Sequence, residues 1–173
     1  MTEKKELILN VALELFANEG YTATSTSKIG KVAGVSEGLI FRHFKNKAGL
    51  LEAIMLETES KIGSLFESIL LDENPKMVIK KTLELPFKIK KSDYDFWKLQ
   101  FKLKWQKEYN HPQKMKPLLD KLTSAFAVLN YPDPVQEALL LNQIFVAVST
   151  EILKGNLKSQ KAYKSFLLKK YQV

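Results

Sequence analysis

Apolar residues recur every three to four positions along nearly the whole sequence, which is the spacing of amphipathic helices. Helix-ending signals interrupt this pattern at Gly20 and Gly34. At Asn74-Pro75 and Asp133-Pro134 a capping residue precedes a proline that suits the first helical position. No segment has a convincing strand pattern, so we expect an all-α chain of about nine helices.

The expected boundaries follow from these signals. Ser25 or Thr26 caps one short helix, Ser36 caps a second, and Asn46 precedes a longer helix that reaches Ile69. Pro86 ends or kinks the helix that begins at Pro75. The later helices are expected at about 93–109, 112–129, 134–153 and 156–171.

The composition fits a folded domain, with 173 residues of which 45% are hydrophobic and 27% charged. The chain has no cysteine, so a disulfide framework and a thiolate metal site are excluded. The longest nearly apolar run, from Ala138 to Val148, is too short to span a bilayer. We therefore expect a soluble cytoplasmic protein without a membrane partner.

The net charge of +8 permits an anionic partner but does not locate one. Five basic residues and one acid, Glu37, lie between Lys28 and Lys47. A second basic block runs from Lys76 to Lys107, and no acid follows Glu151. Positive charge is thus spread along the chain.

Two short helices are joined by Ala33-Gly34-Val35-Ser36, a linking sequence typical of a helix-turn-helix. Gly34 can adopt positive φ, Val35 fills the angle between the helices, and Ser36 caps the second helix. Such a second helix enters the major groove of DNA. Gly38 inside it has two explanations that the sequence leaves open: tight packing against the preceding helix, or close approach of the backbone to DNA.

Many positions in the first 50 residues resemble the tetracycline-repressor (TetR) family DNA-binding domain. They are Gly20-Tyr21, Thr24-Ser25, Ile29, Ala33-Gly34-Val35-Ser36, Gly38, Ile40-Phe41, His43-Phe44, Lys47 and Leu50-Leu51. The resemblance implies a three-helix DNA-binding head over residues 1–46. It also implies an effector-binding and dimerisation domain over residues 47–173, reached through a fourth helix. Two positions depart from the family: Gly30 replaces the usual Ala, and Phe41 replaces a Tyr whose hydroxyl reaches a DNA phosphate. We expect the Phe41 ring still to pack.

The residues expected to contact DNA lie at the beginnings of the two short helices, along the second one and at the beginning of the longer helix. They are Ser25, Thr26, Ser36, Glu37, Gly38, Leu39, Phe41, Arg42, His43 and Lys47. Ser25 offers a hydroxyl and helix amides to a phosphate. Glu37 can accept from a cytosine amino group, and Leu39 can touch a thymine methyl group. The alternative for each is a cap or a solvent-facing side chain; Lys28, Lys31 and Lys45 add diffuse attraction at most.

Aromatic residues recur in the second half, where an apolar cavity between helices would take an apolar or aromatic effector. The candidates for lining it are Phe87, Trp97, Phe101, Trp105, Phe126 and Phe145. Ordinary core packing is the alternative. The lysine block from 76 to 107 hints at an anionic group on the effector, with a solvated face as the alternative.

The helix expected from Pro134 to Leu153 is apolar on more than one face, which suggests a partner helix in a homodimer. With the following helix it resembles the four-helix dimer interface of the family. The expected interface residues are Leu140, Ile144, Val148, Ile152, Tyr163, Phe166 and Leu167. A helix fully buried within one chain is the alternative.

These features favour a bacterial sequence-specific transcription regulator that binds a palindromic double-stranded DNA operator. The resemblance implies a repressor that is released from DNA when an effector changes the spacing of the two heads; activation is the alternative that the sequence leaves open. No cofactor or metal is expected. An enzyme is disfavoured because the chain has two histidines, no phosphate loop and no metal-binding spacing. An architectural DNA-binding protein is the other alternative, against which the large aromatic body argues.

Overall fold

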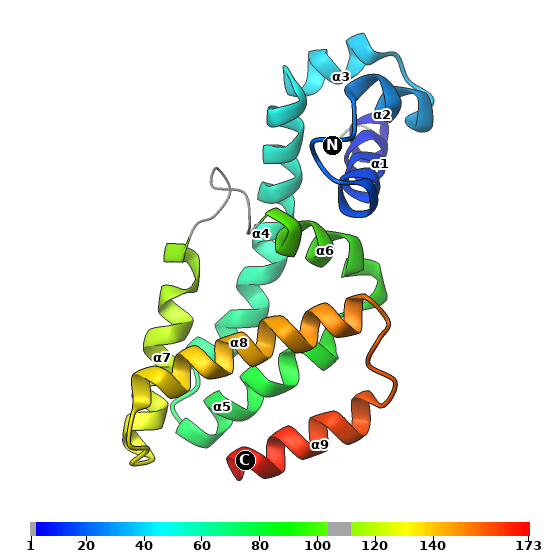
Figure 1. Ribbon diagram of the computed structural model, residues 1–173. Helices are drawn as coiled ribbons and strands as arrows, with labels where there is room; N and C mark the ends of the chain where they lie inside the picture. Colours follow the sequence, from blue (N-terminus) through cyan, green and yellow to red (C-terminus); the bar gives the residue numbers. More distant parts are fainter. Residues whose placement is uncertain (1–2, 104–111) are drawn as a thin grey trace. The chain divides into compact units, whose positions relative to one another are not determined.

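The computed structural model describes residues 3–103 and 112–173, where all regular structure is helical (Figure 1). The α-helices are α1 (Glu3–Glu19), α2 (Thr26–Ala33), α3 (Glu37–Phe44), α4 (Lys47–Leu70), α5 (Pro75–Glu84), α6 (Tyr94–Leu103), α7 (Lys116–Val128), α8 (Pro134–Leu153) and α9 (Gln160–Tyr171). Three short 3-10 helices are η1 (Leu85–Lys88), η2 (Lys91–Asp93) and η3 (Pro112–Met115). The expected all-α class is confirmed. No helix in the described ranges is long and apolar enough to cross a membrane.

Side-chain caps set several helix beginnings, as predicted. The Ser25 hydroxyl accepts the backbone N–H of Lys28 at 3.1 Å, and the Ser36 hydroxyl accepts that of Leu39 at 3.3 Å. Asn74 and Asp133 do the same for α5 and α8, each followed by proline in the first turn. Gly34 ends α2 in the left-handed conformation, with φ of 64°.

The predicted beginning of the last helix at Asn156 is wrong, because α9 begins at Gln160. The Asn156 N–H donates to the carbonyl of Glu151 at 3.0 Å, and its side-chain amide donates to the Glu151 carboxylate. Asn156 therefore completes the end of α8. The predicted break at Pro86 is confirmed, since α5 ends at Glu84 and a 3-10 turn follows. The predicted aromatic helix begins at Tyr94, and its stretch beyond 103 lies outside the described residues.

Packing divides the described chain into two compact units. Unit 1 contains residues 3–62 and 92–103, and unit 2 contains residues 63–91 and 112–173. Helix α6 thus packs with the N-terminal helices. The predicted division after residue 46 separates a DNA-binding part from a part that binds an effector and dimerises. The packing of the chain does not test that division, so it stays a prediction.

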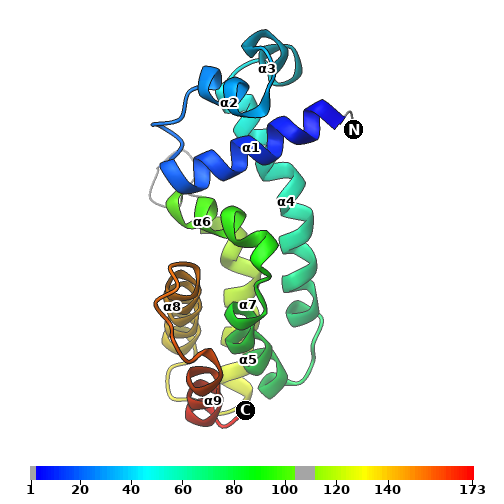
Figure 2. The same ribbon diagram turned by 90° about the vertical axis from the view of Figure 1, so that its right-hand side faces the viewer.

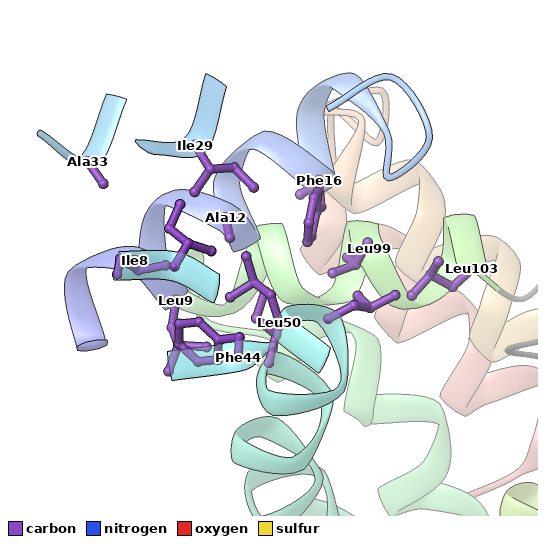
Figure 3. Packing of buried hydrophobic residues seen from close by; sticks show 14 residues of the cluster. Ile8, Leu9, Ala12, Phe16, Ile29, Ala33, Phe44, Leu50, Leu99 and Leu103 are labelled. Atoms are coloured by element: carbon purple, nitrogen blue, oxygen red, sulfur yellow. The ribbon is translucent and has the colours of Figure 1, made fainter. Parts of the chain in front are cut away.

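The core of unit 1 gathers side chains from α1, α2, α3, α4 and α6 (Figure 3). Phe16, Ile29, Ile40 and Leu50 are fully buried, one from each of the first four helices. Leu99 of α6 is fully buried in the same cluster. Unit 1 therefore has a continuous apolar centre, against which α2 and α3 pack.

In unit 2, α5 packs against α7, α8 and α9 (Figure 2). The fully buried Phe126 has the Tyr131 and Tyr171 rings 4.9 and 6.1 Å from its own. Burial, with smaller contributions from Glu137 and Tyr131, raises the pKa of Tyr171 to about 12. The Phe145 ring meets that of Phe66 edge-on at 6.2 Å.

Candidate nucleic-acid interface

The turn between α2 and α3 is closed by backbone contacts. The Val35 N–H donates to the Gly30 carbonyl at 2.9 Å. A Cβ atom added at Gly30 would lie 2.9 Å from the Val35 carbonyl oxygen, closer than real Cβ atoms come. Glycine at this position therefore allows the turn to lie directly against α2, at the cost of a weaker helix propensity.

Helix α3 has one buried and one exposed face. Ile40 and Phe44 lie in the core, whereas Gly38, Phe41 and Arg42 are exposed. A Cβ atom built at Gly38 has no atom within 4 Å, so the interpretation of Gly38 as a tight packing site is wrong for the single chain. Phe41 is 43% exposed, so its ring packs only in part. This open face is the part of α3 that a partner can reach.

Arg42 is the only arginine in the chain. The rest of the 27 lysine and arginine residues are lysines. Its guanidinium makes no salt bridge or hydrogen bond with any described residue. A free guanidinium on an exposed helix face suits guanine or phosphate, which it can bind with two parallel hydrogen bonds. His43 beside it is half-buried, with its ring centroid 6.0 Å from that of Phe44. The sequence alone is enough to show that Arg42 is the chain's only arginine.

The beginnings of both helices meet at one contact. Thr26 Oγ1 donates a hydrogen bond of 2.5 Å to Glu37 Oε1. Both residues are half-buried, as is Leu39. Sequence reasoning placed Thr26 and Glu37 at the interface but did not predict their contact, which joins positions 11 residues apart.

Ser25 and Ser36 are both exposed at helix N-termini. Each hydroxyl oxygen accepts a backbone N–H, which leaves the hydroxyl hydrogen available to a phosphate oxygen. Lys28 is paired with Glu19 at 2.5 Å, whereas the Lys31 and Lys45 residues are exposed.

The ammonium of Lys47 is engaged inside unit 1. Its Nζ atom donates to the carbonyls of Tyr21, Thr24 and Thr22 at 2.8, 2.9 and 3.5 Å. It also lies 4.4 Å from the centroid of the Tyr21 ring. Lys47 therefore stabilises the turn between α1 and α2, a role that sequence reasoning missed.

The candidate effector-pocket residues fall in both units. Trp97 is buried beside Phe96 and Phe101, whose ring centroids lie 5.8 and 5.9 Å from its own. Phe126 and Phe145 are buried in unit 2, and Phe87 is half-buried. Trp105 lies outside the described residues. The aromatic contacts agree with core packing, and a pocket lined by these residues stays a prediction.

Several lysines of the 76–107 block make internal contacts. Lys81 pairs with Asp72 at 2.6 Å, and the hydrogen bond from Lys81 is the main cause of the lowered pKa of Asp72. Lys88 pairs with Glu84 at 3.0 Å. Lys102 donates to the carbonyl of Ala17 at 2.5 Å, at the negative end of the α1 dipole. These contacts weaken the case for an anionic group on the effector.

The candidate dimer residues divide by burial. Val148, Ile152 and Leu167 are at most 5% exposed within one chain, so they belong to the core of unit 2. We therefore withdraw these three residues from the predicted interface, because a buried side chain offers no surface to a partner. Ile144 is half-buried. The exposed candidates are Leu140 at 43%, Tyr163 at 39% and Phe166 at 58%.

Among the described residues, no group of three or more His, Cys, Asp or Glu side chains is placed to hold a metal ion.

Comparison with known proteins agrees with this geometry. Residues 8–54 match the sequence model described as bacterial regulatory proteins, tetR family. The uncharacterized HTH-type transcriptional regulator YvkB of Bacillus subtilis is 45% identical over 67 residues, which are 39% of this chain and 35% of that protein. The chain thus covers about a third of the length of this curated relative.

Solved structures extend the likeness to the rest of the fold. A TetR-like transcriptional regulator from Rhodococcus sp. RHA1 superposes with a TM-score of 0.76 at 16% identity, covering 95% of this chain and 91% of that one. FadR from Bacillus subtilis, solved in complex with stearoyl-CoA, superposes with a TM-score of 0.69 at 21% identity, covering 96% of both chains. Residues 8–54 therefore match the tetR-family model by sequence, and the chain has the fold of a TetR-like regulator over nearly its whole length.

Proposed function

We propose that this protein is a transcription regulator whose helix α3 enters the major groove of a specific DNA operator. The observation that carries the proposal is the exposed face of α3. It combines the chain's only arginine, Arg42, with a glycine, Gly38, that has no atom within 4 Å of an added Cβ. Arginine is the commonest reader of guanine, and a helix without a side chain at Gly38 can approach DNA closely.

The flanking groups support the same placement. The exposed hydroxyls of Ser25 and Ser36 stand at helix N-termini, where the backbone dipole favours a phosphate. Phe41 lacks the hydroxyl with which the family's tyrosine reaches a phosphate. We therefore expect these two serines to provide the phosphate contacts at the helix ends.

A palindromic operator needs two heads, so we further propose that the protein acts as a homodimer. The exposed apolar residues Leu140 on α8, and Tyr163 and Phe166 on α9, are the candidates for the contact between copies. The four-helix interface of the family supports this choice.

We also propose that a small apolar or aromatic effector releases the DNA. The FadR relative is described as bound to stearoyl-CoA, which has a long apolar chain. An effector acts in this way only if it binds the DNA-released state more tightly, and DNA must then weaken effector binding by the same factor.

The first experiment measures binding of the purified protein to the duplex upstream of its own gene and to a scrambled duplex, at two salt concentrations. We expect the upstream duplex to bind about a thousandfold more tightly, with the preference retained near physiological salt. Arg42→Lys keeps the charge but loses the planar fork, so it should reduce the preference while retaining the salt dependence. Lys31→Ala, at an exposed position of α2, is the control and should keep the preference for the upstream duplex.

Equal and salt-sensitive affinity of the wild type for both duplexes would favour the architectural alternative. The same assay tests effectors: at least one member of a panel of apolar and aromatic ligands should release the operator, and unchanged affinity across the whole panel would contradict the ligand-responsive part of the proposal.

A further inference from the structure

The hydrogen bond between Thr26 and Glu37 links the first residues of the two helices of the helix-turn-helix. Thr26 begins α2 and Glu37 begins α3. The distance of 2.5 Å from Thr26 Oγ1 to Glu37 Oε1 is that of a charge-assisted hydrogen bond from a hydroxyl to a carboxylate. Such a bond restricts the rotations of the glutamate side chain.

The bond uses only part of each group. Thr26 gives its single hydroxyl hydrogen to Glu37, so it cannot donate to a DNA phosphate at the same time. The second carboxylate oxygen, Oε2 of Glu37, makes no hydrogen bond within the described residues. A half-buried carboxylate with one fixed and one free oxygen is an oriented acceptor.

The position of that acceptor decides what it can recognise. N-terminal residues of a recognition helix lie next to base edges in the major groove. A carboxylate there repels phosphates, but it accepts a hydrogen bond from the amino group of cytosine. Its charge is also favoured at the N-terminus of α3 by the helix dipole.

We propose that Glu37 selects cytosine in the operator and that Thr26 is the positioning residue that orients its carboxylate. This inference rests on the proposed function, because it assumes that α3 lies in the major groove. It changes the role expected for Thr26 from a DNA contact to an internal one. Ser25, whose hydroxyl hydrogen is not used by the N-cap bond, then provides the phosphate contact beside it.

A purely structural role for the pair would be to hold α2 against α3. Other contacts already do so, because Ile29, Ala33 and Ile40 are buried in the same core and Val35 bonds to Gly30. Loss of the Thr26 hydroxyl should therefore disturb the carboxylate more than the fold.

The test is selection of bound sequences from a pool of random duplexes, with thermal unfolding measured in parallel. The proteins are the wild type, Thr26→Val, Thr26→Ser, Glu37→Gln and the control Thr22→Val, an exposed threonine in the same head. The wild type should recover a consensus with a cytosine whose replacement weakens binding about tenfold. Thr26→Val should lose that one preference and keep the others, whereas Thr26→Ser and Thr22→Val should retain it. Glu37→Gln should shift it toward adenine, which an amide binds with two hydrogen bonds.

The experiment distinguishes failure of the proposed function from failure of the inference about Glu37 and Thr26. If the wild type recovers no consensus, the proposed function fails and the inference fails with it. If the wild type recovers a consensus that Thr26→Val and Glu37→Gln leave unchanged, the inference alone fails. If Thr26→Val lowers the unfolding temperature and weakens binding equally at every operator position, the pair is structural and the inference is overturned.

Discussion

Gly38 is the residue at which stability and function should move in opposite directions. An alanine there meets no neighbouring atom within the chain and should raise the free energy of unfolding by about 0.5–1 kcal/mol through its helix propensity. The added methyl group would stand between α3 and DNA, so operator affinity should fall about tenfold or more, as a lost base contact does. Denaturant unfolding and operator binding measure the two effects.

The matched control is Gly63→Ala in α4, where an added Cβ also meets nothing within 4 Å. It should gain the same stability and leave operator affinity unchanged. Unaltered DNA binding by Gly38→Ala would mean that α3 does not approach DNA closely at this position.

Lys47 resembles the lysine with which the family binds a DNA phosphate, and its contacts here allow that role to be tested. Its Nζ atom donates to three carbonyls of the turn between α1 and α2. Lys47→Ala should therefore lower the free energy of unfolding by about 2 kcal/mol, because it leaves those carbonyls without their charged donor. Lys31→Ala should change it by less than about 0.5 kcal/mol.

The salt dependence of DNA binding separates this structural role from a phosphate contact. A lysine that binds a phosphate contributes about 0.9 to the slope of log affinity against log salt. With its ammonium engaged internally, Lys47→Ala should leave the slope unchanged. A slope lower by about one would restore Lys47 to the DNA interface.

At the level of elements, local signals in the sequence were enough to predict most helix boundaries. Ser25 and Ser36 are followed by helices because each side chain accepts the backbone N–H three residues further along the chain, and such capping residues are visible in the sequence. The same reasoning failed at Asn156, where the side chain bonds backward to Glu151 instead of forward. A capping residue does not reveal which of two adjacent helices it serves.

Contacts between distant elements were not predictable in this way. The sequence indicated that α6 has an aromatic stripe but not which helix its other side contacts. In the structure, Leu99 and Leu103 enter the core of unit 1, and Lys102 caps the end of α1 from 85 residues away. Periodicity identifies an apolar face, whereas its partner depends on the packing of the whole chain.

The membership of α6 in unit 1 makes a prediction about Leu99. Leu99→Ala should lower the free energy of unfolding of unit 1 by about 3 kcal/mol, because it leaves a cavity at a fully buried position. Leu56→Ala, at a site in α4 that is 63% exposed, is the matched control and should change it by less than about 0.5 kcal/mol. Hydrogen exchange of the α1 and α2 amides reports on unit 1 specifically. If those amides stay protected in Leu99→Ala, α6 does not stabilise the N-terminal helices.

At the scale of the whole molecule, the operator recognition by two heads proposed above requires a contact between two copies of the chain. The apolar side chains buried in unit 2 already have partners, which leaves Leu140, Tyr163 and Phe166 as exposed candidates. The rings of Tyr163 and Phe166 lie 6.0 Å apart and form one apolar surface on α9. Burial of large aromatic residues at the centre of an interface contributes most of its binding free energy.

Phe166→Lys combined with Leu140→Lys should therefore convert the dimer to a monomer. We expect the dimer dissociation constant to rise at least about thirtyfold, the effect of losing an interface residue worth about 2 kcal/mol. Sedimentation velocity across a range of protein concentrations measures it. The unfolding of the monomer should be little changed, because both positions are exposed within one chain.

The control is Leu71→Lys combined with Val128→Lys, two residues that are 74% and 68% exposed elsewhere in unit 2. It should remain dimeric and bind the full operator as the wild type does. The Phe166 and Leu140 variant should bind a full palindromic operator no more tightly than a single half-site, since linkage of the two heads is what multiplies their affinities. A variant that sediments as a dimer and keeps full operator affinity would place the contact between copies on another surface.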